Sequence, residues 1–337
     1  MTDAATTTDG GLAPSAPAPP ARRASHVALL RDYGILIVIA LLVISLTLST
    51  DTFATAGNLR NLLDQMVVVG IIACGVTLCI IAGIFDLSTS AILAVSAILG
   101  ITVTQSMGVG AGMVAAVLAG ALLGLLNGLV ITGIGVNSFI ATLASSIIFR
   151  GVAILLTGGT IVYPLVDQLL GFQVMTYPTR PLGLTVSTFV LLAVIALTWF
   201  LLSSTTYGRS LYAVGGNAEA ARLSGIRVDR VRVIALMISG TCSGLAGVVL
   251  SSRAGSAQAS LGEGLELSAI AATVVGGTSI LGGEGAIWRA IAGVLILQLF
   301  SNGFNLLGWD TTYQQVLTGF LILLAVSVDQ LLRRRRR

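Results

Sequence analysis

The sequence predicts an all-α polytopic membrane protein with about ten transmembrane helices arranged in two related halves. Three observations lead to this prediction. The chain of 337 residues is 55% hydrophobic and only 9% charged, whereas a soluble domain carries about 25% charged residues. Its mean hydropathy is +0.98. Apolar stretches of about 20 residues, the length that a helix needs to cross a bilayer, recur along most of the chain.

The N-terminal segment differs from the rest of the chain. Residues 1–30 begin with a long run rich in alanine, proline and threonine, which cannot bury enough apolar surface to fold, so we predict a disordered cytoplasmic tail. Residues 31–332 then form the transmembrane domain, and residues 333–337 form a basic cytoplasmic tail. An alternative for the first apolar run is a signal peptide that is cleaved near residues 54–56 (ATA).

The predicted spans lie near residues 34–50, 64–82, 88–105, 110–132, 138–157, 185–203, 231–251, 265–281, 286–302 and 312–331. With the N-terminus inside, 14 arginines lie on the cytoplasmic side and 3 on the outer side, while Arg150 falls within a span. Because cytoplasmic loops carry an excess of basic residues, this asymmetry supports ten spans with both termini in the cytoplasm. Residues 158–184 then form a turn-rich extracytoplasmic loop with a short interfacial helix, and residues 204–230 form a cytoplasmic loop.

The residue types exclude several classes of site. All 18 basic residues are arginine, and a Walker A phosphate loop needs a lysine, so we expect no ATP-hydrolysing site on this chain and no enzyme activity of its own. The single histidine, His26, lies in the N-terminal tail, which excludes histidine-based triads and His-rich metal sites. We therefore expect no metal or cofactor bound by this chain, and no nucleic acid partner.

Residues 207–229 form the longest polar interruption in the second half of the chain. They predict a turn at 215–217, whose asparagine can cap, and a short helix over 218–223 (AEAARL) that ends at the Ser-Gly pair 224–225. A short, capped, basic helix between two spans is suited to contact with a partner. The alternative is a plain cytoplasmic loop whose arginines only set the topology.

Two other segments interrupt the apolar pattern in similar ways. These are AGIFDLSTS at 82–90 and VGGTSILGGEG at 275–285, and each places glycine, hydroxyl side chains and an acid between apolar helices. Comparable interruptions in two halves indicate an internal repeat, and irregular backbone at membrane depth is either buried or lines a cavity. The alternative is two ordinary tight turns on the inner face.

Several long motifs resemble one family of transport proteins. In the second half they are GRSLYAVGGNAEAARLSGI at 208–226, ELSAIAATVVGGTSILGGEG at 266–285 and SNGFNLLG at 301–308. In the first half, AGIFDLSTSAILAVSA at 82–97 resembles the family's GGIDLSVG segment. Over about residues 33–332 the chain resembles the permease subunits of bacterial ATP-binding-cassette importers for monosaccharides, the ribose/xylose/autoinducer type, which belong with the branched-chain amino-acid permeases.

The resemblance implies a multi-pass subunit of the bacterial inner (plasma) membrane that works as a homodimer. It also implies an extracytoplasmic sugar-binding protein and separate cytoplasmic ATPase subunits, which bind ATP and magnesium. The central loop would be the coupling helix that seats on the ATPase, where Glu219, Arg222 and the small alanines beside them can lie close to a partner. The residues at this implied contact are Gly208, Arg209, Gly216, Asn217, Glu219, Ala220, Arg222, Leu223 and Gly225.

Polar residues at membrane depth are candidates for a substrate pathway. Arg150 either serves the pathway, extends to the outer interface or caps carbonyls of a broken helix, and Asp86 can orient its turn by accepting backbone N–H bonds. Gln298, Asn302 and Asn305 share one helical face, which suits a neutral hydroxylated substrate or, alternatively, joins helices. The candidate pathway residues are Asp86, Ser88, Asn127, Arg150, Gln298, Asn302, Asn305, Tyr313 and Gln314.

Two other functions are consistent with this architecture. The first is import of branched-chain amino acids, although a zwitterion favours charged or helix-terminus partners and the polar candidates here are mostly amides and hydroxyls. The second is an ion-coupled secondary transporter, which needs a membrane-buried acid pair that only Asp86 approaches.

Overall fold

A computed structural model describes residues 26–177 and 183–310, together with residues 313, 316, 319, 320 and 323. Within these residues every regular element is a helix, and Val162 and Ala257 pair in an isolated antiparallel bridge. The chain divides into two units, Met1–Gly34 and Ile35–Arg337, and the packing described below is that of the second unit.

The helices are α1 (His26–Ser49), α2 (Ala56–Ile81), α3 (Thr89–Met107), α4 (Val109–Ile134), α5 (Ser138–Thr157), α6 (Leu169–Phe172), η1 (Gln173–Thr176), α7 (Val186–Ser204), α8 (Thr206–Gly216), α9 (Ala218–Leu223), α10 (Val228–Ala254), α11 (Leu265–Val275) and α12 (Ile287–Leu306). Among the described residues, seven helices are long and apolar enough to cross a membrane. The predicted all-α polytopic membrane fold is confirmed. The tenth predicted span, 312–331, lies mostly outside the described residues.

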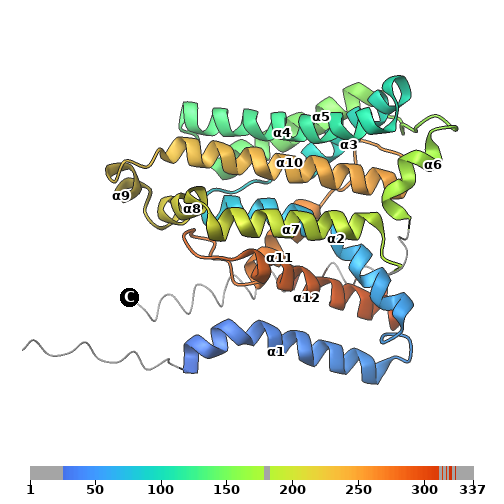
Figure 1. Cartoon of the computed structure of the whole chain (residues 1–337), viewed down its shortest axis with the longest axis horizontal. Helices are drawn as coiled ribbons and strands as arrows, with labels where there is room; N and C mark the ends of the chain where they lie inside the picture. The colour runs from blue at the N-terminus through green and yellow to red at the C-terminus, as the bar shows by residue number, and fades with distance from the viewer. Residues whose placement is uncertain are drawn as a thin grey trace, which may run out of the picture. The chain divides into compact units, whose positions relative to one another are not determined.

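The core of the bundle is built around α2. This helix packs against α7, α10, α11 and α12, and α10 also runs beside α4 (Figure 1). The apolar window of α2 is 89% buried, whereas that of α5 is only 11% buried. A helix that is apolar on all sides needs either protein or lipid around it. We infer that α2 is an interior helix and that α5 turns most of its apolar side chains toward the bilayer.

A row of small residues lets α4 and α10 approach each other closely. On α4 the row repeats every fourth position, as Ala116, Gly120, Gly124 and Gly128. A side-chain carbon added to Gly120 would overlap the Gly240 carbonyl oxygen and would lie 2.8 Å from the Gly244 Cα on α10. Small residues at this spacing bring helix backbones together in membranes, where van der Waals packing holds helices. The close approach of the two helices therefore depends on the absence of side chains at Gly120, Gly124 and Gly128.

The predicted span at 265–281 is shorter in the structure. The helix α11 has 11 residues, about 16 Å, which is half of what a bilayer core requires. It ends where the Gly276 N–H donates to the Ala272 carbonyl, and Gly277 follows with a φ of 89°. An irregular segment, residues 276–286, then leads into α12. Ile280 and Leu281 lie beyond the helix end and keep the average hydropathy of the window high, so the window extends the span too far.

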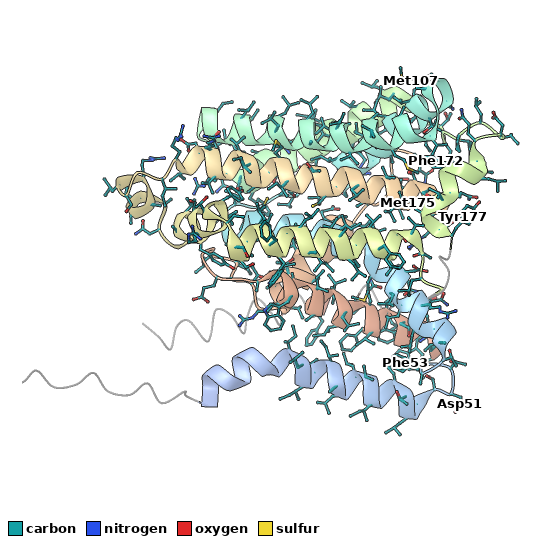
Figure 2. The ribbon with its side chains drawn as sticks, in the orientation of Figure 1. Asp51, Phe53, Met107, Phe172, Met175 and Tyr177 are labelled. Atoms are coloured by element: carbon teal, nitrogen blue, oxygen red, sulfur yellow. The ribbon has the colours of Figure 1, made fainter. Side chains whose placement is uncertain are left out.

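The predicted turn-rich loop at 158–184 contains two short helices, α6 and η1. Phe172, on α6, is only 2% exposed, and its carbonyl accepts a hydrogen bond of 2.7 Å from the Ser252 Oγ at the end of α10. Figure 2 shows Phe172 with Met175 and Tyr177 along this segment. The loop is thus packed onto one end of the bundle, while residues 178–182 lie outside the described residues.

The short helix predicted at 218–223 is confirmed as α9, with both of its predicted boundaries. The Ala220 N–H donates to the Asn217 Oδ1 at 3.0 Å, which is the expected cap, and Gly225 follows with a φ of 83°. A second helix, α8, precedes it and was not predicted. The Thr205 side chain caps α8 by accepting from the Gly208 N–H at 3.1 Å. The pair α8–α9 lies at one end of the bundle, with α9 outermost (Figure 1).

Candidate functional site

The irregular segment 82–88, between α2 and α3, is centred on a fully buried carboxylate. Asp86 is 0% exposed. Its Oδ1 accepts from the Ser88 N–H at 3.0 Å and from the Ser88 Oγ at 2.5 Å, and its Oδ2 accepts from the Ser239 Oγ of α10 at 2.7 Å. The Asn127 Nδ2 of α4 donates to the Ser88 Oγ at 2.8 Å. Three of the predicted pathway residues, Asp86, Ser88 and Asn127, thus form one network with Ser239.

Side chains of α5 bind the backbone of the same segment. The Phe85 N–H donates to the Ser138 Oγ, and the Leu87 N–H donates to the Thr142 Oγ1, each at 3.1 Å. Non-helical backbone survives at membrane depth only where its polar groups are satisfied by protein or water. The hydroxyls therefore explain how the segment 82–88 departs from helical geometry. Asp86 orients its turn, because it accepts a hydrogen bond from the Ser88 N–H. Its other hydrogen bonds are with the hydroxyls of Ser88 and Ser239.

Arg150, on α5, binds the loop between α10 and α11. Its Nη1 donates to the carbonyls of Ala259 and Leu261, the second at 3.3 Å, and its Nη2 donates to the Ser90 Oγ on α3 at 3.1 Å. This geometry matches the alternative in which the guanidinium caps backbone carbonyls. The side chain joins α3, α5 and the loop at 255–264.

The amides of α12 are placed differently from one another. Asn302 is buried and forms a reciprocal pair with Asn58 on α2: the Asn58 Nδ2 donates to the Asn302 Oδ1 at 3.0 Å, and the Asn302 Nδ2 donates back to the Asn58 Oδ1 at 2.9 Å. Gln298 is half-buried and Asn305 is exposed. The helix-joining alternative therefore describes Asn302. Tyr313 is exposed, and Gln314 lies outside the described residues.

The predicted coupling residues gather on α8, α9 and the turn that follows. Leu223, at the end of α9, is 82% exposed, and Glu219 is also exposed. The Arg222 Nη2 lies 3.8 Å from the Asp229 Oδ1, with both side chains largely exposed, so the pair is weak. Of the predicted coupling residues, α8 carries Gly208, Arg209 and Gly216, and α9 carries Glu219, Ala220, Arg222 and Leu223. The other two are the helix cap Asn217 and the turn residue Gly225.

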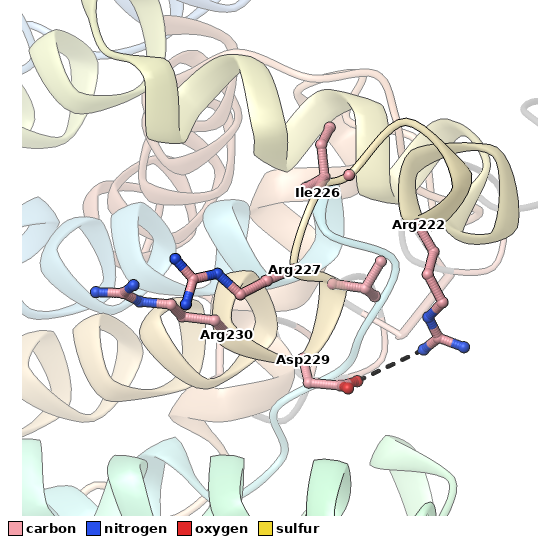
Figure 3. A pocket seen from close by; sticks show the side chains of 7 residues that line it. Arg222, Ile226, Arg227, Asp229 and Arg230 are labelled. Carbon is pink, nitrogen blue, oxygen red and sulfur yellow. Dashed lines mark ion pairs between the residues drawn. The ribbon is translucent and has the colours of Figure 1, made fainter.

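A basic hollow lies between α9 and α10. Figure 3 shows Arg227 and Arg230 on one side of it and the Arg222–Asp229 ion pair on the other. The lining residues are Arg222, Gly225, Ile226, Arg227, Val228, Asp229 and Arg230. An exposed, basic surface with an apolar leucine beside it is suited to binding a protein that offers acidic and apolar groups.

Two tyrosines of α8 hold this helix against the bundle, and sequence reasoning missed both. The Tyr207 hydroxyl donates to the Val231 carbonyl of α10 at 3.1 Å, and the Tyr212 hydroxyl donates to the Gly285 carbonyl at 2.7 Å. Burial raises the pKa of both phenols, so both remain protonated donors at neutral pH. Ser239, Ser138, Thr142 and Asn58 were also missed, because single hydroxyls and amides on apolar helices carry no signal of their partners.

Comparisons with known proteins agree with the resemblance that the sequence motifs indicate. Residues 58–326 match the family described as "Branched-chain amino acid transport system / permease component". The chain is 40% identical over 306 residues to the ribose import permease protein RbsC of Bacillus subtilis, covering 90% of this chain and 94% of that protein. It is 36% identical to the D-allose transport system permease protein AlsC of Escherichia coli, covering 89% and 92%. It is also 36% identical to the L-arabinose transport system permease protein AraH of Escherichia coli, covering 89% and 90%.

Proposed function

Because this chain belongs to the family of branched-chain amino acid transport system permease components, we propose that it is the membrane-spanning permease subunit of an ATP-binding-cassette importer. It translocates a monosaccharide or a similar polyol across the inner membrane. The observation that carries the proposal is similarity along 89–90% of the chain to permease proteins named for ribose, D-allose and L-arabinose. All three are neutral sugars, which supports a neutral hydroxylated cargo.

The placement of charged groups also favours a sugar over an amino acid. A zwitterion requires charged or helix-terminus partners at membrane depth. Among the described residues, both oxygens of the Asp86 carboxylate accept hydrogen bonds from serine hydroxyls. The Arg150 guanidinium donates to a backbone carbonyl and to the Ser90 hydroxyl. Neither group is placed to bind the carboxylate or the ammonium of an amino acid in this conformation.

The transport cycle requires partners that this chain does not supply. Separate cytoplasmic ATPase subunits bind and hydrolyse ATP, an extracytoplasmic sugar-binding protein delivers the cargo, and a second copy of the chain completes the translocation unit. We assign the ATPase contact to α9 and the end of α8, whose exposed side chains include Leu223, Glu219 and Arg222. ATP binding changes the contacts that the ATPase makes with this helix pair. These contacts then shift the permease between its inward-facing and outward-facing states.

Charge reversal on α9 tests this assignment. Glu219→Arg and Arg222→Glu place the wrong charge at the proposed interface, and like charges across an interface are strongly unfavourable. We expect ATP-driven uptake to fall at least about tenfold, a loss of about 1.4 kcal/mol, with the spans still folded. The measurement is co-purification with the ATPase in mild detergent, followed by ATPase activity and uptake in liposomes.

The matched control is Asp229→Asn. It breaks the same ion pair as Arg222→Glu but leaves the charges of α9 unchanged. We expect near-normal uptake from this variant, because an exposed pair contributes little stability. Unchanged uptake in both α9 variants would contradict the assignment of α9 to the ATPase contact, and equal losses in Arg222→Glu and Asp229→Asn would assign the effect to the ion pair instead.

A further inference from the structure

The end of α8 lies between the two irregular segments of the bundle. A side-chain carbon on Gly215 would overlap the Ile81 carbonyl oxygen at the end of α2 and would lie 2.5 Å from the Gly283 nitrogen. A side-chain carbon on Gly282 would lie 3.0 Å from the Gly83 Cα. Glycines of three separate parts of the chain therefore meet backbone to backbone. We call this contact, made by Gly83, Gly215, Gly282 and Gly283, the glycine junction.

Two hydrogen bonds cross the contact. The Gly283 N–H donates to the Ile81 carbonyl at 2.9 Å, which ties the segment 276–286 to the end of α2. The Tyr212 hydroxyl donates to the Gly285 carbonyl at 2.7 Å, which ties α8 to the same segment. The helix α8 is thus bonded to the segment 276–286 and lies against the start of the segment 82–88.

Close packing of this kind transmits displacement. Backbone atoms in contact have no flexible side chain between them to absorb a shift, and packed interiors have low compressibility. The segment 82–88 is in turn bonded to α5 by Ser138 and Thr142 and to α10 by Ser239. The segment 276–286 joins the half-length helix α11 to α12. A movement of α8 therefore reaches several spans through these two segments.

We infer that Tyr212 and Gly215 are positioning residues that couple movement of the α8–α9 pair to both irregular segments, and hence to the spans that they join. This inference rests on the proposed function, because it assumes that the ATPase moves α8 and α9. The crowding is specific to one of two neighbouring glycines. A side-chain carbon on Gly216 would have no atom within 4 Å, whereas one on Gly215 meets the Ile81 carbonyl at the end of α2 and the Gly283 nitrogen of the segment 276–286.

The conservative variant is Tyr212→Phe, which removes the hydroxyl and keeps the ring. Its matched control is Tyr207→Phe, which removes the other buried hydroxyl of α8, whose acceptor is on α10 and not at the junction. In the complex with the ATPase and the binding protein, uptake and ATP hydrolysis are measured in the same liposomes. We expect sugar uptake per ATP to fall about 2- to 10-fold in Tyr212→Phe, the effect of one hydrogen bond, and to stay unchanged in Tyr207→Phe.

Gly215→Ala is the stronger variant, because its methyl group must displace backbone. We expect it to abolish uptake while the complex with the ATPase still assembles. Gly216→Ala adds the same methyl group to the next residue and controls for folding, with an unchanged midpoint of thermal unfolding expected. If Gly215→Ala does not fold, the tyrosine pair still decides the question.

Hydrogen exchange of the permease alone provides a readout that does not depend on transport. We expect Tyr212→Phe, but not Tyr207→Phe, to accelerate exchange of peptides that cover residues 276–286. If the unaltered complex transports sugar and Tyr212→Phe matches it in uptake per ATP, the inference is wrong although the proposed function stands. If the unaltered complex takes up no sugar, the proposed function is wrong. In that case hydrogen exchange still tests the contact, and an unchanged exchange rate at 276–286 in Tyr212→Phe would show that the Tyr212 hydroxyl does not hold this segment.

Discussion

Replacing Asp86 by alanine removes the acceptor of three hydrogen bonds at the centre of the segment 82–88. The donors are the Ser88 N–H, the Ser88 hydroxyl and the Ser239 hydroxyl. Hydrogen bonds between membrane helices contribute roughly 0.6 kcal/mol on average and about 1.7 kcal/mol at most. Only the Ser239 bond joins Asp86 to a helix, and applying the same range to all three bonds predicts a loss of roughly 2–5 kcal/mol in the free energy of unfolding for Asp86→Ala. Ser239→Ala removes one of them and should cost about 0.6–1.7 kcal/mol.

The assay is unfolding of the purified permease in mixed micelles with increasing denaturing detergent, followed by tryptophan fluorescence. A double-mutant cycle with Asp86→Ala and Ser239→Ala isolates the bond between these two side chains. We expect the double variant to be no less stable than Asp86→Ala alone, because the serine has already lost its acceptor. Fully additive losses, or an Asp86→Ala variant as stable as the unaltered chain, would refute the reasoning that this network holds the segment.

Three further variants test other contacts. Asn302→Ala removes both hydrogen bonds to the half-buried Asn58 amide and should lower the free energy of unfolding by about 1–3 kcal/mol, with a less than additive loss in the double alanine variant; no loss in the single variant would contradict the pairing. Arg150→Leu removes the hydrogen bonds to the loop at 255–264, so it should accelerate hydrogen exchange of that loop and lower uptake while the ATPase still co-purifies. Loss of membrane expression would indicate a folding role instead. Gly124→Leu should block the approach of α4 to α10 and prevent folding, whereas Gly133→Leu, where a side chain meets open space, should fold normally.

The helices were predictable because hydropathy and caps are local signals. The short helix α9 was predicted with its asparagine cap and its glycine end, since both signals lie within the nine residues 217–225. The helix α8 was not predicted. Its sequence, TYGRSLYAVGG, is polar enough to leave the apolar pattern, and its glycines favour a turn on propensity alone. The length of α11 was overestimated, because Ile280 and Leu281 keep the average hydropathy high beyond the glycine, threonine and serine residues that follow the helix.

The contacts between distant segments were beyond sequence reasoning. The spacing of Asn302 on α12 indicated a polar helical face, but its partner Asn58 lies 244 residues away. Asp86 was identified as a turn-orienting acid, whereas Ser239 on α10 carries no mark of that contact. The meeting of α8 with both irregular segments involves glycine backbone, which leaves no side-chain pattern to read.

The measurement that tests the central claim most directly is uptake of a panel of sugars and branched-chain amino acids into liposomes that contain this chain, its ATPase and its binding protein. The account predicts uptake of one monosaccharide or polyol that requires ATP and both partners. Uptake of a branched-chain amino acid instead would contradict the assignment of the cargo. Uptake by the chain alone, driven by an ion gradient, would contradict the importer itself.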